Sequence, residues 1–192
     1  MFKVYITFIL LLLPVVSLAQ VHVLIAYHSE TGNTEKLANA VAEGAQTVEG
    51  IQITIKPVSE TSESDLIQAD AIIVGSPVYN ANIAPAVSQF ITSWPFGGSP
   101  LKDKIGAAFV TSGGISAGEE IVQMNILQSM LVFGMVVVGG PDWTQPFGAS
   151  AITGETPFQI NNPDNVDEQF LQKGRNLGKR VAEIALRMHQ NH

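Results

Sequence analysis

The chain has 192 residues, no cysteine and a formal net charge of −7 at pH 7. This length is typical of one domain, and hydrophobic residues, at 46%, are numerous enough for a packed core. Nucleic-acid binding needs a basic surface, so the acidic balance argues against it. The lack of cysteine excludes disulfides, thiol nucleophiles and iron–sulfur ligation by thiolates.

Residues 1–19 have the pattern of a signal peptide. Lys3 gives a short basic start, residues 4–16 are an apolar run, and Ser17-Leu18-Ala19 places small residues at the position of cleavage. The apolar run is shorter than the roughly 20 residues that a transmembrane helix needs. We therefore expect cleavage after Ala19 and a periplasmic or secreted domain of residues 20–192, with no transmembrane segment after cleavage. An uncleaved membrane anchor is the alternative.

Strand-like and helical patterns alternate through the rest of the chain. The expected strands are residues 21–27, 51–56, 71–75, 105–110 and 135–138, and the expected helices are residues 34–48, 65–69, 83–94, 119–133 and 164–188. This alternation is typical of βαβ units and a parallel sheet. Strict apolar–polar alternation in residues 51–56 favours a place at a sheet edge. The sequence therefore predicts an α/β, doubly wound, three-layered fold with a five-stranded parallel sheet in the order 2-1-3-4-5.

One long segment, residues 139–163, has no clear period and is rich in Gly, Pro, Thr and Asn. It is too long for an ordinary connection between a strand and a helix. We expect it to be a functional insertion.

The loop between the first strand and the first helix carries hydroxyls and a glycine. Its candidate ligand-binding residues are Ser29, Glu30, Thr31, Gly32, Asn33 and Thr34. A strand that ends in such a loop and enters a helix is typical of a phosphate site built from hydroxyls, backbone N–H groups and a helix N-terminus. Because no Lys or Arg precedes Lys36 in this loop, it suits a tightly held mononucleotide such as FMN better than a nucleotide whose phosphates are cleaved. The alternative is an ordinary helix start with Thr34 as N-cap.

Other phosphate-binding loops do not fit the chain. The P-loop is excluded because no Gly-Lys-Ser/Thr occurs, and the Gly-x-Gly-x-x-Gly of dinucleotide folds is missing after the first strand. In a doubly wound sheet the ligand lies at the carboxyl ends of the strands, where the strand order reverses. Three loops are expected to converge there, at residues 29–34, 76–83 and 111–118.

The loop at residues 29–34 resembles the FMN phosphate loop of the flavodoxin superfamily. More of the chain resembles its WrbA-type branch, the flavodoxin-like NAD(P)H:quinone oxidoreductases, and the likeness covers nearly all of residues 21–188. The motifs that carry it are Ala40-Val41-Ala42-Glu43-Gly44-Ala45, Gly75-Ser76-Pro77, Asn82, Gly134-Met135-Val136-Val137-Val138-Gly139, Phe147-Gly148-Ala149-Ser150 and Leu177-Gly178-Lys179-Arg180-Val181-Ala182-Glu183-Ile184-Ala185.

The resemblance implies a bound FMN and roles for matching residues. Those expected to line the isoalloxazine are Pro77, Val78, Tyr79 and Asn82, and those expected at its other edge are Thr111, Ser112, Gly113 and Gly114. It also implies two-electron transfer to a quinone or other redox partner, and a homodimer or homotetramer. Two departures concern the electron donor and the quinone pocket: Tyr79 stands where that branch usually has an Arg, and Ala151 where it usually has a His.

Several alternatives stay open at this point. A flavodoxin-type electron shuttle and a non-catalytic flavin-binding protein fit the same loop. Gly114-Ile115-Ser116-Ala117-Gly118 matches the nucleophile elbow of serine hydrolases, although only His189 and His192 follow it. Trp143 is a candidate for flavin contact, whereas Trp94 is expected to be a packing residue. The four His residues show no metal-ligand spacing, so we expect no metal.

Overall fold

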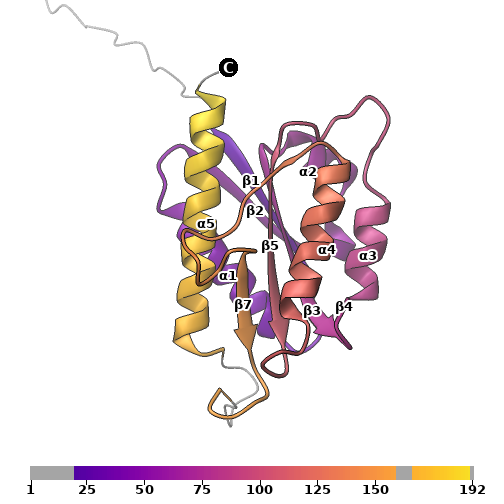
Figure 1. Ribbon diagram of the computed structural model, residues 1–192. Helices are drawn as coiled ribbons and strands as arrows, with labels where there is room; N and C mark the ends of the chain where they lie inside the picture. Colours follow the sequence, from indigo (N-terminus) through magenta and orange to yellow (C-terminus); the bar gives the residue numbers. More distant parts are fainter. Residues whose placement is uncertain (1–19, 159–165, 191–192) are drawn as a thin grey trace, which may run out of the picture.

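The computed structural model describes residues 20–158 and 166–190 as one sheet between two layers of helices (Figure 1). The strands are β1 (Val21–Tyr27), β2 (Ile51–Pro57), β3 (Ala71–Tyr79), β4 (Asn82–Ile83), β5 (Ile105–Ser112), β6 (Val136–Val137) and β7 (Ala149–Ile152). The helices are α1 (Asn33–Gln46), α2 (Glu63–Gln68), α3 (Pro85–Thr92), α4 (Glu119–Val132) and α5 (Glu168–His189), with a 3-10 turn η1 (Val58–Glu60). The predicted α/β architecture is confirmed.

The sheet order is β2-β1-β3-β5-β6, with β7 also paired to β5 and β4 paired to β3. All these pairings are parallel except that of β3 with β4. The order of the five main positions matches the prediction, and β2 lies at the edge as its alternation indicated. The predicted count of five strands is wrong, because the described residues form seven.

The two additional strands have different origins. β4 is the return arm of a short hairpin at the end of β3. β7 lies within the segment that was expected to be an irregular insertion, and it pairs with Phe109–Ser112 of β5, whereas β6 pairs only with Ile105 and Gly106. The last position of the sheet is therefore filled by two short strands joined by residues 138–148. Residues 159–163 of the expected insertion lie outside the described residues.

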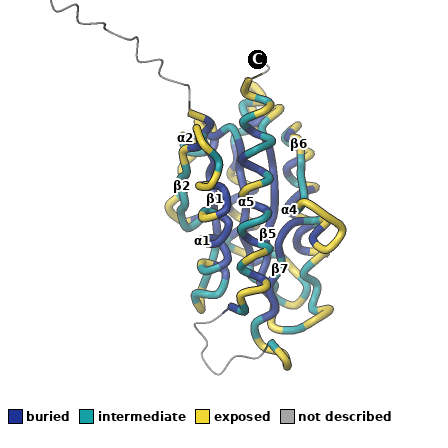
Figure 2. The backbone as a smooth tube through the Cα atoms, turned by 90° about the vertical axis from the view of Figure 1, so that its left-hand side faces the viewer, coloured by how far each residue is buried: buried dark blue, intermediate teal, exposed yellow. Residues whose placement is uncertain are grey.

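Each face of the sheet packs under its own helices. α1 and α5 cover one face, while α2, α3 and α4 cover the other (Figure 1). β1 supplies both cores: Val23 and Ile25 face the first, Leu24 and Ala26 the second, and all four are fully buried. Figure 2 shows the middle strands as buried and β2 as largely intermediate. A strand that is apolar on both sides is stable only inside such a sheet.

Helices α1 and α5 approach so closely that glycines are required between them. A Cβ at Gly44 would lie 1.9 Å from the carbonyl oxygen of Arg175, and one at Gly178 would lie 1.8 Å from that of Val41. In both cases the obstructing atom belongs to a helix backbone, which cannot move aside as a side chain can. The small residues thus set the distance between the two helices that cover β1.

Substitution of Gly178 by Ala is expected to lower the free energy of unfolding by about 1–3 kcal/mol, the usual cost of overpacking. Urea titration followed by circular dichroism measures the change. Gly97→Ala is the matched control, since nothing lies within 4 Å of the added Cβ. Equal stability of the two variants would mean that α1 and α5 are not in this contact.

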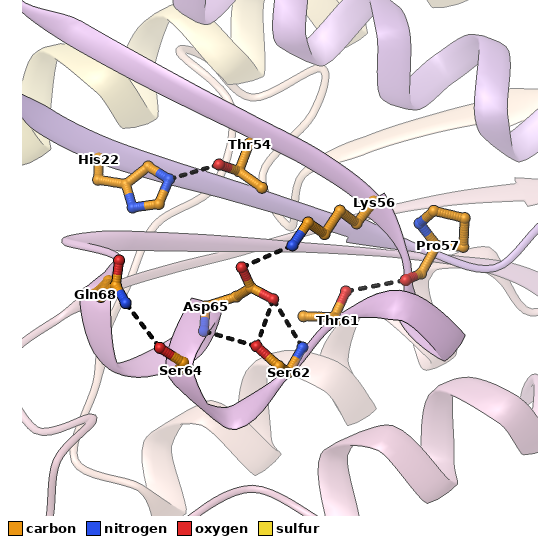
Figure 3. Close-up of polar contacts among 9 residues, drawn as sticks. All are labelled: His22, Thr54, Lys56, Pro57, Thr61, Ser62, Ser64, Asp65 and Gln68. Atoms are coloured by element: carbon orange, nitrogen blue, oxygen red, sulfur yellow. Dashed lines mark hydrogen bonds and ion pairs between the residues drawn. The ribbon is translucent and has the colours of Figure 1, made fainter.

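The connection from β2 to β3 is held by a polar network around Asp65 (Figure 3). Lys56 Nζ donates to Asp65 Oδ1 at 2.8 Å, and the N–H of Ser62 donates to Asp65 Oδ2 at 2.8 Å. The Ser62 hydroxyl in turn accepts from the N–H of Asp65 at 3.2 Å, which completes a capping box at α2. The hydrogen bond from Lys56, followed by those from Ser62, lowers the pKa of Asp65 from 3.8 to about 2.

This shift predicts a pH-dependent contribution to stability. Because the pKa of Asp65 is lower in the folded protein, the contribution is present above about pH 4 and is lost as the pH falls towards about 2. The free energy of unfolding of wild type minus that of Asp65→Asn should therefore shrink between these values in urea titrations. Asp103→Asn is the control, since its carboxylate is 65% exposed and lies 3.9 Å from Lys102 Nζ, and we expect little effect at any of these pH values.

The expected signal peptide, residues 1–19, lies outside the described residues. Within residues 20–158 and 166–190, none of the helices combines the length and the apolar character needed to cross a bilayer.

Candidate functional site

The structure brings the three predicted loops together at the carboxyl ends of β1, β3 and β5. The hydroxyls of Thr34 and Thr111 lie 2.8 Å apart in a buried hydrogen bond, which joins the first loop to the third. The N–H of His28 donates to the carbonyl oxygen of Gly75 at 3.1 Å, just before the second loop. A Cβ at Gly118 would lie 2.5 Å from that of Ala81, so the third loop touches the second.

The first loop leaves the start of α1 open. The N-cap is Gly32 in the left-handed region, with φ of 83° and no side-chain capping bond. Thr34 is therefore not the N-cap, and the alternative of an ordinary capped helix start does not hold. The first backbone N–H groups of an uncapped helix need an external acceptor, and the helix dipole makes an anion the most favourable one.

The hydroxyls of this loop are not equivalent. The Ser29 Oγ is buried and has no hydrogen-bond partner, whereas Thr31 is exposed. Thr34 is 2% exposed, and its hydrogen bond with Thr111 uses the proton of only one of the two hydroxyls. The other hydroxyl of the pair keeps its proton for donation to a ligand. Asn33 Oδ1 is also buried without a partner, and as an acceptor it suits a hydroxyl rather than a phosphate. A phosphate with an attached polyol chain would satisfy both orphaned atoms.

The second loop is more regular than expected. Pro77, Val78 and Tyr79 are the last residues of β3, and Asn82 returns in β4. The hairpin turn is made by Asn80 and Ala81, with φ of 51° and 61°. Positive φ at both central residues is typical of two-residue hairpin turns, because it matches the twist of the strands. Such a conformation is unfavourable for alanine, and strain of this kind tends to occur at ligand-contacting turns.

Tyr79 is partly buried on this hairpin and lies close to Glu30 of the first loop. Burial, followed by a hydrogen bond to the Glu30 carboxylate, raises the pKa of Tyr79 above its usual value. The phenol is therefore neutral near pH 7, and its contact with Glu30 links the first loop to the second.

The third loop begins with buried hydroxyls and continues with accessible glycine. Thr111 and Ser112 are 5% and 3% exposed, and the Ser112 hydroxyl donates to the carbonyl oxygen of Gly114 at 3.0 Å. Gly113 is exposed. The structure adds one residue that the sequence did not indicate: Glu155, whose Oε2 accepts from the N–H of Ile115 at 2.6 Å. No motif marks it, because it lies 40 residues from its partner.

The charge around the three loops is negative. The loops contain no Lys or Arg, while Glu30 and Glu155 are exposed beside them and Glu119 Oε1 accepts from the N–H of Ser116 at 3.3 Å. A histidine, His28, borders the first loop, and its Nε2 lies 3.6 Å from Glu30 Oε1. An anion bound here is held by backbone dipoles and hydroxyls rather than by a cation.

Three further residues singled out in the sequence, Trp143, Ala151 and Trp94, differ in where they lie, and Ala151 pairs with Thr111. Trp143 is 86% exposed, on residues 138–148, which leave the sheet between the register positions of Gly106 and Phe109 rather than at the strand ends. Ala151 is fully buried in β7 and has no surface to offer a ligand. Trp94 is 4% exposed and packs against the ring of Phe90, as expected of a packing residue.

The serine-hydrolase alternative fails on geometry. His189 Nδ1 lies 3.8 Å from Asp70 Oδ1, and Asp70 precedes β3. This His is therefore at the amino end of the sheet, opposite the loop that carries Ser116. His192 lies outside the described residues. No group of three or more His, Asp or Glu side chains suitable for a metal ion occurs in the part of the chain that the structure describes.

These features define a class of protein: a doubly wound α/β domain whose uncapped α1 terminus, unpartnered Ser29 hydroxyl and three converging loops fit the phosphate, ribityl chain and ring of FMN. Comparison with known proteins agrees. The model of the family described as NADPH-dependent FMN reductase matches residues 19–149. The chain belongs to this family, binds FMN and is an FMN-dependent oxidoreductase.

Individual proteins of known sequence or structure are similar to this chain over most of its length. A flavodoxin of Aquifex aeolicus is 34% identical over 171 residues, covering 84% of this chain and 85% of that protein. An NAD(P)H dehydrogenase (quinone) of Archaeoglobus fulgidus is 30% identical over 190 residues, covering 85% and 96%. The crystal structure of a WrbA-like flavodoxin from Agrobacterium tumefaciens has the same fold, with a TM-score of 0.73 at 23% identity, covering 88% of this chain and 99% of that one.

Removal of either loop threonine is expected to weaken FMN binding. Thr31→Ala and Thr34→Ala should each cost about 1.5–3 kcal/mol of affinity, the range for a hydrogen bond to a charged group. Titration of apoprotein with FMN, followed by quenching of flavin fluorescence, measures this.

The two variants should differ in stability. Thr34→Ala also breaks the buried bridge to Thr111 and should lower the free energy of unfolding by about 1 kcal/mol, whereas Thr31 is exposed. Thr92→Ala, at an exposed position on α3, is the control and should change neither quantity. Wild-type affinity in both loop variants would show that the phosphate is bound elsewhere.

Proposed function

We propose that this chain is an exported FMN-dependent oxidoreductase that passes two electrons to a quinone or other redox partner. The observation that carries the proposal is the cradle at the start of α1, where an uncapped helix terminus meets a buried, unpartnered Ser29 hydroxyl. Bound FMN supplies the redox chemistry. The protein binds and orients the flavin and limits the access of other molecules to it.

The residues of the three loops divide this work. Gly32 lets the chain turn so that the N–H groups of α1 face the phosphate, and the Thr34–Thr111 bridge fixes that turn against β5. Tyr79 offers a neutral, partly buried aromatic ring for contact with the isoalloxazine. Gly113 offers backbone groups with no side chain in the way.

Relatives support a quinone as the acceptor. Proteins named NAD(P)H dehydrogenase (quinone) in Archaeoglobus fulgidus, Geotalea uraniireducens and Rhodopseudomonas palustris are 30–32% identical to this chain. Each alignment covers 96–98% of the relative. By the same resemblance, the proposal includes a homodimer or homotetramer, which light scattering of the purified protein tests.

The electron donor is proposed to differ from that of these relatives. The loops of the site carry no Lys or Arg, and Tyr79 occupies the position where the resembling branch usually has an Arg. Export would also remove the protein from cytoplasmic NAD(P)H. A quinol or another redox protein is therefore the proposed donor. N-terminal sequencing of the mature protein tests export, with Gln20 as the expected first residue.

Rapid mixing of the FMN-loaded protein with donors tests this assignment. We expect slow reduction of the flavin by NADPH and faster reduction by a soluble quinol, because the acidic site repels the phosphates of NADPH. Flavin absorbance in a stopped-flow instrument follows both reactions. Rapid reduction by NADPH with a low KM would overturn the proposed donor.

A flavodoxin-type electron shuttle is the second candidate, favoured by the Aquifex aeolicus relative of that name. Stepwise reductive titration separates the two functions. Accumulation of a one-electron-reduced flavin favours the shuttle, and direct two-electron reduction favours the oxidoreductase. A flavin that no donor or acceptor turns over would leave a non-catalytic flavin-binding protein.

A further inference from the structure

Residues Thr153, Gly154 and Glu155 form a strap that is bonded to the third loop residue by residue. The N–H of Thr153 donates to the carbonyl oxygen of Ser112, and the N–H of Gly154 to that of Gly113, both at 2.9 Å. The Thr153 hydroxyl also donates to the Ser112 carbonyl oxygen, at 3.0 Å. These bonds extend the pairing of β5 with β7 beyond the end of both strands.

Glu155 completes the strap with its side chain. Its Oε2 accepts from the N–H of Ile115 at 2.6 Å, and the same oxygen would lie 2.8 Å from a Cβ at Gly114. The carboxylate therefore lies close to the backbone of Gly114, and a side chain at this position would require Glu155 to shift. This contact fixes the loop at Ile115, two residues beyond Gly113, where the last backbone bond of the strap is made.

The position of this carboxylate also has an electrostatic consequence. Gly113 and Gly114 are the residues expected at the edge of the isoalloxazine, and Glu155 is exposed beside them. Reduced flavin carries more negative charge than oxidised flavin, so a fixed negative charge nearby opposes reduction. Because Glu155 is exposed, water and salt weaken the effect without removing it.

We propose that Glu155 is a positioning residue of the flavin site, whose carboxylate both holds the third loop in place and makes bound FMN harder to reduce. The electrostatic part rests on the proposed function, in that it needs the flavin edge at Gly113 and Gly114. The positioning part rests on the hydrogen bond to Ile115 alone.

Two substitutions separate the two effects. Glu155→Gln keeps an oxygen that can accept from Ile115 but removes the charge, whereas Glu155→Ala removes both. Glu120→Gln is the matched control, because it removes one carboxylate from the exposed first turn of α4. Three quantities are measured: affinity for oxidised FMN, the two-electron midpoint potential of the bound flavin, and amide hydrogen exchange at Ile115 in the apoprotein.

For Glu155→Gln we expect affinity for oxidised FMN within about twofold of wild type and unchanged exchange. Relative affinity for reduced over oxidised FMN should rise about three- to tenfold, equivalent to about 15–30 mV for a two-electron couple. In about 1 M salt, where the screening length falls to roughly 3 Å, this difference in potential should largely vanish. A merely structural role would not depend on salt in this way.

For Glu155→Ala we expect about three- to tenfold weaker binding of oxidised FMN and faster exchange at Ile115. For Glu120→Gln we expect neither the weaker binding nor the faster exchange. A wild-type potential in Glu155→Gln overturns the electrostatic part. Wild-type exchange in Glu155→Ala overturns the positioning part, and this is measured without FMN. If wild-type apoprotein binds no FMN, the proposed function fails, and the electrostatic part fails with it.

Discussion

The structure depends on the burial of β1, in which every residue but the partly buried His22 is buried. Its side chains point alternately into two separate cores, so it is stable only with a strand on each side and a helical layer over each face. Parallel pairing with β3 then brings the ends of both strands to one edge of the sheet. The strand order reverses beside β1, and this leaves the crevice in which a ligand of a doubly wound sheet is bound.

The proposed phosphate site at that edge has no Lys or Arg in its loops. Anion binding at such a site needs backbone N–H groups in fixed positions, and the structure provides the necessary stiffness through a chain of contacts. The Thr34–Thr111 bridge joins the first loop to β5, Tyr79 reaches Glu30 from the hairpin, and the close approach of α1 to α5 fixes the helix whose uncapped terminus is the proposed phosphate site. The residues proposed to bind the cofactor therefore also contribute to stability.

The sequence predicted most of the fold because its signals were local. The bounds of β1 match the prediction, and α4 differs by one residue at its end. The mostly apolar run of β1 and the helical spacing of Val122, Ile126 and Met130 in α4 are local signals that need no knowledge of their partners. β7 was missed because Ala149-Ser150-Ala151-Ile152 has small residues and gains its strand character from pairing with β5. The hairpin at Asn80 and Ala81 was missed because alanine gives no sign of a turn with positive φ.

Within the site, the chemical type of each loop was predictable, but the partners were not. The composition of residues 29–34 indicated a phosphate loop, whereas the role of Gly32 as an uncapped helix start follows only from its backbone angles. Thr34 was expected to face the ligand, and the structure adds that its hydroxyl is shared with Thr111. Glu155 could not be found from the sequence, because its contact with Ile115 depends on how β7 is aligned with β5.

The division of the last sheet position into β6 and β7 also bears on solubility. A long, flat edge strand offers a row of unpaired N–H and C=O groups to which another molecule can add a strand. Here one edge consists of strands of two and four residues separated by a loop, so it presents no continuous row. The opposite edge, β2, carries Lys56 and ends in Pro57, residues that discourage strand addition by charge and by a missing donor. Both edges of the sheet thus resist edge-to-edge aggregation, each by a different device.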